Sequence, residues 1–89
     1  MARSLLLADE IVLPTTTGTA TSFGAATVVR LVNTGSSSSV VYVKETQSGT
    51  GVGSMTVPGN TVEYLEKNSS YVVYASSSDV RGAKVGFTG

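Results

Sequence analysis

The sequence predicts an all-β protein: a small antiparallel β-sandwich or flattened barrel of six to eight strands with an extended N-terminal arm. Valine dominates the apolar residues, with 14 copies against one isoleucine, and its branched side chain favours strands. Clusters of glycine and serine interrupt the apolar runs every eight to twelve residues, a spacing typical of sandwiches and barrels. No segment shows the 3.6-residue period of an amphipathic helix.

The positions of these breaks set the expected strands. We expect strands at residues 10–14, 22–33, 39–47, 52–57, 61–67, 70–76 and 82–88. The connecting stretches are rich in threonine, serine, glycine and asparagine, which are common in turns. Between the fourth and fifth strands, Pro58 and Gly59 fit a type II turn, because proline presets φ and glycine supplies the positive φ that follows.

Several strands alternate apolar and polar residues, which indicates antiparallel sheets with one buried and one solvated face. In the last strand, Ala83, Val85 and Phe87 share one face, and Lys84 lies on the other. The alternation predicts a core made of Val29, Leu31, Val41, Val43, Met55, Val57, Val62, Tyr64, Val73, Val85 and Phe87.

The segment 1–14 is the most apolar part of the chain and ends at Pro14. One interpretation is an edge strand of the domain's own sheet. The other is an arm that lies on a neighbouring subunit and adds a strand there. In both cases residues 15–89 form a single β-sandwich domain. The apolar run stops at Asp9 and Glu10, shorter than the roughly seven residues of a secretory core, so we expect no signal peptide and no membrane span.

The composition excludes the common catalytic and metal-site designs. The chain has no histidine, cysteine or tryptophan, and histidine and cysteine carry most proton transfer, nucleophilic catalysis and zinc binding. We therefore expect no enzyme, no cofactor and no metal. Six basic residues balance six acidic ones and form no block, which argues against nucleic-acid binding. A domain of this size without disulfides has little stability to spare, so docking or oligomerisation is expected.

Two motifs that resemble functional sites, a glycine-rich stretch and a pair of glutamates, have structural explanations. The glycine-rich stretch 49–53 runs into an expected strand, whereas a phosphate-binding loop opens a helix. Glu63 and Glu66 lie three residues apart on a strand and point to opposite faces, so they cannot act as a carboxylate pair.

Interface residues are the remaining candidates. Tyrosine is enriched at interfaces because its apolar ring ends in a polar hydroxyl, and Tyr42 shares its strand face with Lys44, which is expected to face outward. The predicted interface residues are Leu5, Leu6, Leu7, Ile11, Leu13, Tyr42 and Tyr71.

Residues 23–88 resemble small virion structural proteins of tailed phages, notably those of marine and cyanobacterial phages. The similar features are the strand VVRLVNTG at 28–35, the Pro58-Gly59 turn, the strand VEYLEK at 62–67 and the final strand AKVGFT at 83–88. The resemblance implies a non-enzymatic β-sandwich that decorates or cements a capsid. No catalytic or binding residues carry over from it.

We therefore expect a virion structural protein that docks on the major capsid protein or on other virion proteins, alone or as a homo-oligomer. It would be made in the host cytoplasm and reside on the capsid surface. The alternative function is a small carbohydrate- or protein-recognition module in a tail or surface adhesin, which would use exposed tyrosines and polar loops.

Overall fold

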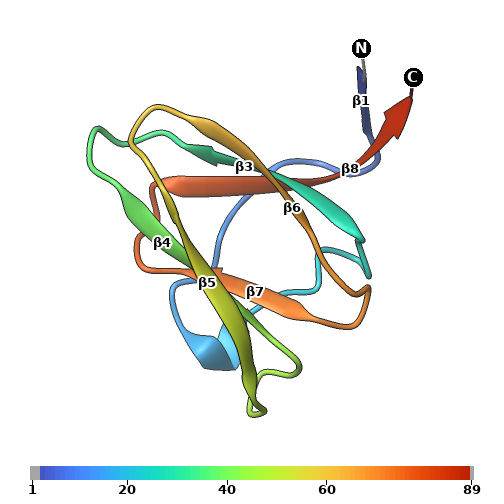
Figure 1. Ribbon diagram of the computed structural model, residues 1–89, viewed down its shortest axis with the longest axis vertical. Helices are drawn as coiled ribbons and strands as arrows, with labels where there is room; N and C mark the ends of the chain where they lie inside the picture. Colours follow the sequence, from blue (N-terminus) through green and yellow to red (C-terminus); the bar gives the residue numbers. More distant parts are fainter. Residues whose placement is uncertain (1–2, 89) are drawn as a thin grey trace.

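The computed structural model describes residues 3–88 and consists of two antiparallel β-sheets (Figure 1). One sheet has the strand order β1-β8-β3-β6, with β2 also paired to β8, and the other has the order β5-β4-β7. The strands are β1 (Arg3–Leu6), β2 (Ile11–Val12), β3 (Val28–Asn33), β4 (Ser39–Lys44), β5 (Gly51–Val57), β6 (Val62–Glu66), β7 (Val72–Ala75) and β8 (Val80–Thr88). A short 3-10 turn, η1 (Thr17–Thr19), is the one helical element within residues 3–88. The predicted all-β class is confirmed.

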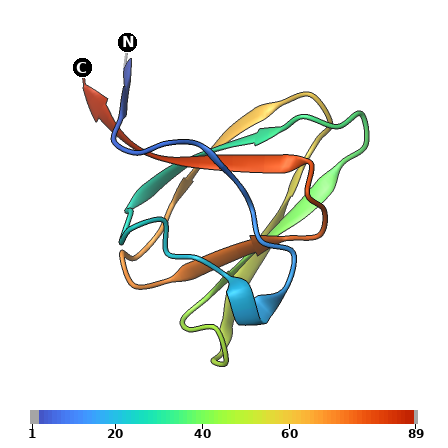
Figure 2. The ribbon, with the colours of Figure 1, turned by 180° about the vertical axis from the view of Figure 1, so that it is seen from behind.

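The N-terminal segment is an edge strand of the domain's own sheet. β1 pairs with the end of β8, and β2 pairs with the start of β8. The strand expected at 10–14 is reduced to the two residues of β2, and β1 agrees with the interpretation of segment 1–14 as an edge strand. The extended arm is therefore not found in this chain. β1 and the end of β8 form a two-stranded ribbon that projects from the rest of the molecule (Figures 1 and 2).

The expected strand at 22–33 begins only at Val28, because residues 23–25 form a loop with positive φ angles. Phe23, Gly24 and Ala25 have φ values of 55°, 63° and 59°, a left-handed conformation that is unfavourable for residues with a Cβ. The phenyl ring of Phe23 is buried in the core. Burial of this ring offsets the backbone strain and anchors the loop.

The core lies between the two sheets and follows the predicted alternation on the central strands. Six predicted core residues are buried in it: Val29, Leu31, Val41, Val43, Val57 and Val73. Met55 is partly buried and packs against the same cluster. Five core members come from outside the prediction: Leu13, Phe23, Ala26, Ala75 and Val80.

The last strand is turned over relative to the prediction. Opposed residues of an antiparallel pair share a face. Fully buried Leu31 lies opposite Gly82, whereas the half-buried Arg30 lies opposite Ala83. β8 therefore presents its even-numbered residues to the interior. Phe87 is 49% exposed, and its predicted place in the core is wrong, because a shift of one residue inverts the face of a strand.

The residues next to Phe87 on this face are still covered. Val85 is buried, as predicted, and so is Ala83, but neither belongs to the main core cluster. They lie on the outer side of the five-stranded sheet. The inward positions are held by Val80, Gly82 and Lys84. Only one of these three residues has a large apolar side chain, so alternation in the sequence did not identify this face as the buried one.

The edge strand β6 also differs from the prediction. Val62 and Tyr64 are 42% and 46% exposed, so they are not core residues. Leu65, which lies opposite buried Val29, packs against the core in their place. Both faces of this strand carry apolar residues, and pairing with β3 decides which one is buried.

The turn between β5 and β6 needs its glycine for a different reason from the predicted one. The positive φ of 59° falls on Asn60 and not on Gly59, so the type II prediction is wrong. A Cβ at position 59 would instead collide with the backbone of Ser36. Asparagine tolerates the left-handed conformation better than most residues with a side chain.

We predict that Gly82→Ala destabilises the fold by about 1–3 kcal/mol through overpacking. A Cβ there would lie 2.8 Å from Cζ of Phe23 and 2.9 Å from Cδ1 of Leu13. Gly53→Ala is the matched control, because a Cβ at Gly53 meets nothing within 4 Å. Urea unfolding measures both, and equal stabilities for the two variants would contradict the inward orientation of Gly82.

Candidate interaction surface

Exposed apolar side chains concentrate on the five-stranded sheet and its N-terminal edge. The structure describes nine large apolar side chains that are between 42% and 65% exposed. Eight of them come from this side of the molecule: Leu5, Leu6, Leu7, Ile11, Val12, Val62, Tyr64 and Phe87. The ninth, Val52, lies on β5 of the other sheet. A concentration of exposed apolar side chains of this kind is typical of interaction sites in soluble proteins.

Pairing divides these residues between the two faces of the sheet. Leu6 lies opposite Val85, and Val12 lies opposite Arg81, so both project outward with the odd-numbered residues of β8. We define the ribbon face as the five exposed residues on the outer side of the sheet: Leu6, Val12, Val62, Tyr64 and Phe87. Leu5, Leu7 and Ile11 lie along the same edge of the molecule.

Direct contacts hold the ribbon against β6 at the centre of this surface. The ring of Phe87 lies 5.2 Å from that of Tyr64, centroid to centroid, with an interplanar angle of 60°. The hydroxyls of Ser4 and Tyr64 form a hydrogen bond of 3.0 Å. Since Ser4 is paired with Phe87, both strands of the ribbon touch the same tyrosine. The contact fixes an exposed aromatic pair in one geometry.

Charged groups lie on the same outer side of the sheet as the ribbon face. Nη1 of Arg30 lies 3.6 Å from Oε2 of Glu10, an exposed pair that contributes little to stability. The hydrogen bond between Tyr64 and Ser4 and the neighbouring Arg30 guanidinium lower the pKa of the Tyr64 hydroxyl. Arg30 is paired with Tyr64 on one side and with Ala83 on the other, so this face of the sheet combines apolar and charged side chains, as protein–protein interfaces usually do.

The predicted interface residues fall into separate places. Leu5, Leu6, Leu7 and Ile11 are exposed together on the N-terminal edge. Leu13 is 1% exposed and belongs to the core, so it is unavailable to a partner. Tyr42 and Tyr71 lie on the other side of the sandwich, away from the N-terminal edge.

The two tyrosines have intramolecular partners. Tyr42 stacks on Tyr74 with a centroid distance of 4.7 Å and an interplanar angle of 17°, so each ring covers one face of the other. Tyr71 packs against the core. Sequence reasoning missed Tyr64 and Phe87 as surface residues, because strand alternation assigned them to the core.

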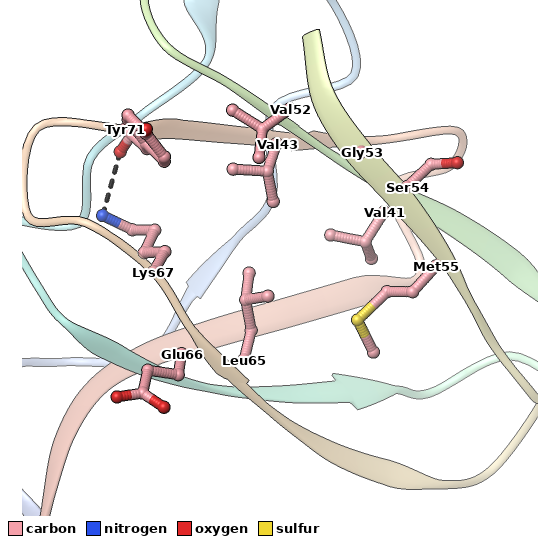
Figure 3. Close-up of a pocket in the computed structure, with 10 residues that line it drawn as sticks. All are labelled: Val41, Val43, Val52, Gly53, Ser54, Met55, Leu65, Glu66, Lys67 and Tyr71. Carbon is pink, nitrogen blue, oxygen red and sulfur yellow. Dashed lines mark hydrogen bonds between the residues drawn. The ribbon is translucent and has the colours of Figure 1, made fainter.

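A second feature is an apolar cavity between the free edges of β5 and β6 (Figure 3). Its volume is about 260 Å³, and its walls include Val43, Met55 and Leu65. Lys67 also lines the cavity, and this residue is only 8% exposed. Its Nζ donates hydrogen bonds to the carbonyls of Ala26 (2.8 Å), Tyr71 (2.9 Å) and Asn68 (3.3 Å).

Other kinds of site are not evident in the part of the chain that the structure describes. Residues 3–88 contain no group of three or more acidic side chains placed to hold a metal ion. No helix within the same range is long and apolar enough to cross a membrane. The expectations of no enzyme, metal or cofactor stay predictions from composition.

Comparison of the chain with family models, with curated proteins and with solved structures finds no match. Function must therefore be inferred from the surface of this chain and from its sequence resemblance.

We predict that the stability of the protein rises as the pH increases toward 10.5, the ordinary value for lysine. Burial lowers the pKa of the Lys67 amine in the folded state. Between that lowered pKa and 10.5 the unfolded chain binds more protons than the folded one, so the free energy of unfolding increases with pH. Urea unfolding at several pH values from neutral to about 10 measures the slope.

Two variants assign that slope to Lys67. Lys67→Met should reduce the rise, whereas Lys84→Met, which removes a more accessible amine bound to the carbonyl of Gly24, should leave it in place. An undiminished slope in Lys67→Met would show that another group is responsible.

Proposed function

We propose that this chain is a non-enzymatic structural protein that docks through its ribbon face on a repeated protein lattice. The observation that carries the proposal is the cluster of half-exposed apolar side chains on one edge and face of the five-stranded sheet. The resemblance to tailed-phage virion proteins gives the lattice an identity. It is the capsid, on which this chain acts as a decoration or cement protein bound to the major capsid protein or another virion protein.

The composition of the ribbon face suits a permanent contact. Its centre is the Tyr64–Phe87 pair, and large aromatic residues in the middle of an interface supply much of its binding energy. Leu6 and Val62 widen the apolar area around the pair. Arg30 and Glu10, on the same side of the sheet, add polar contacts that orient the partner.

Docking also adds stability, of which the isolated domain has little to spare. A chain of 89 residues with no disulfide has a small core and a modest margin of stability. In a lattice, many copies of a moderate contact reinforce one another without requiring high affinity from any single copy. Low charge content, at 13% of residues, is compatible with a surface that stays covered.

We predict that Phe87→Ser and Tyr64→Ser leave the fold intact and weaken docking by about thirtyfold or more each, as expected for central aromatic residues. Both side chains are nearly half exposed, so neither substitution empties the core. Co-sedimentation of the purified chain with particles that lack it measures docking. Val52→Ser is the matched control, because Val52 is 52% exposed on the opposite sheet.

Wild-type occupancy by both aromatic variants would refute docking through the ribbon face. The number of copies per particle separates the proposal from the alternative of a recognition module. A decoration protein follows the capsid lattice in many copies, whereas an adhesin component is present in a handful.

A further inference from the structure

The cavity between β5 and β6 combines an apolar interior with a buried positive charge. β5 ends the three-stranded sheet and β6 ends the five-stranded sheet, so the sandwich is open on this side. Figure 3 shows Val43, Met55 and Leu65 directed toward the space between the strands. A mostly apolar cavity with a few polar or charged groups is the usual design of a small-molecule site.

The charge of Lys67 is not matched by a carboxylate. Its three hydrogen-bond partners are neutral backbone carbonyls. Within residues 3–88 the one ion pair is Arg30–Glu10, on the far side of β3. The neighbouring Glu66 also lines the cavity, but its carboxylate is directed away from the amine of Lys67 (Figure 3). Burying an ammonium group without a counterion is costly, so an anion at this position would be favourable.

We propose that this cavity binds a free aliphatic monocarboxylate, with its alkyl chain among Val43, Met55 and Leu65 and its carboxylate beside Nζ of Lys67. The proposal is independent of the ribbon face. The bond from Nζ to the carbonyl of Asn68 is the longest of the three, at 3.3 Å. A carboxylate oxygen takes the place of this carbonyl and leaves the bonds to Ala26 and Tyr71 intact.

The size of the cavity limits the ligand. A volume of about 260 Å³ holds roughly eight or nine non-hydrogen atoms, if each takes about the 30 Å³ that a water molecule occupies in the liquid. Hexanoate has eight such atoms and fits this volume. Longer chains extend through the opening between the strands. Burial of Lys67 lowers the pKa of its amine, because burial disfavours the charged form. A carboxylate paired with the amine would stabilise that charged form.

The test is a titration of the isotope-labelled full chain, followed by nuclear magnetic resonance, with butanoate, hexanoate and octanoate. We expect saturable shifts centred on Met55, Leu65 and Val43. Affinity should rise about fourfold for each added methylene until the cavity is filled. Hexanol and hexylamine, which keep the chain and change the head group, should bind roughly tenfold more weakly or not at all, because they lack the carboxylate–ammonium bond.

Protein variants give a second measurement. Val52→Phe places a ring at the opening and should reduce hexanoate affinity, whereas Val62→Phe, at an exposed valine of the other sheet, should not. Lys67→Met should abolish the preference for hexanoate over hexanol. Absence of saturable shifts, equal binding of hexanoate and hexanol by the wild-type chain, or shifts centred on Tyr64 and Phe87 would each overturn the proposal. The head-group comparison needs no variant, so it stands even if Lys67→Met fails to fold.

Discussion

The missing side chain at Gly82 is the constraint on which the rest of the arrangement depends. Gly82 faces the interior of the sandwich, and the space that it leaves is filled by Phe23 and Leu13. These two residues tie the left-handed loop and the N-terminal segment to the core. Because position 82 must face the interior, the other even-numbered residues of β8 face inward as well. The odd-numbered residues, including Phe87, face outward. The exposure of Phe87 and its contact with Tyr64 therefore follow from the packing requirement at Gly82, five residues earlier in the same strand.

The same arrangement covers one side of the sandwich and leaves the other open. β1 and β2 pair with the edge of β8. The edge of β7 is met by Thr21, which bonds Val73, and by the carbonyl of Pro14. β5 and β6 have no neighbouring strand on their outer edges within residues 3–88. The cavity lies between these two edges on the inner side of β6, which carries Leu65, whereas Val62 and Tyr64 of the ribbon face lie on the outer side of the same strand. The two proposed sites therefore occupy separate regions of one small domain.

The sequence was sufficient for the fold class and for the central strands. β3 and β4 each have a neighbour on both edges and one clearly apolar face, so alternation identified Val29, Leu31, Val41 and Val43 correctly. Alternation failed on β6 and β8, where both faces carry apolar residues or where the inward face holds a glycine and a lysine. Pairing with β3 settles the orientation there, and pairing is a tertiary property.

The candidate sites were harder to predict for the same reason. The leucines of the N-terminal edge could be recognised as a group, because they are adjacent in the chain. Tyr64 joins them only through the fold, by contacts with Phe87 and Ser4. The sequence pattern did not single out Lys67. Its burial depends on the carbonyl of Ala26, from a distant segment, together with that of Tyr71, across the adjacent turn. No local pattern in the sequence records such closure.

The contact between the rings of Tyr64 and Phe87 tests the account most directly, because it exists only if β8 turns Phe87 outward and the ribbon lies against β6. Nuclear Overhauser measurements on the free protein would show it. The structure predicts cross-peaks between the two rings and from Tyr64 to the β-protons of Ser4, with none from Phe87 to Val41 or Val73. Cross-peaks from Phe87 to those core valines, without a contact to Tyr64, would contradict the orientation of β8 and remove the basis of the ribbon face.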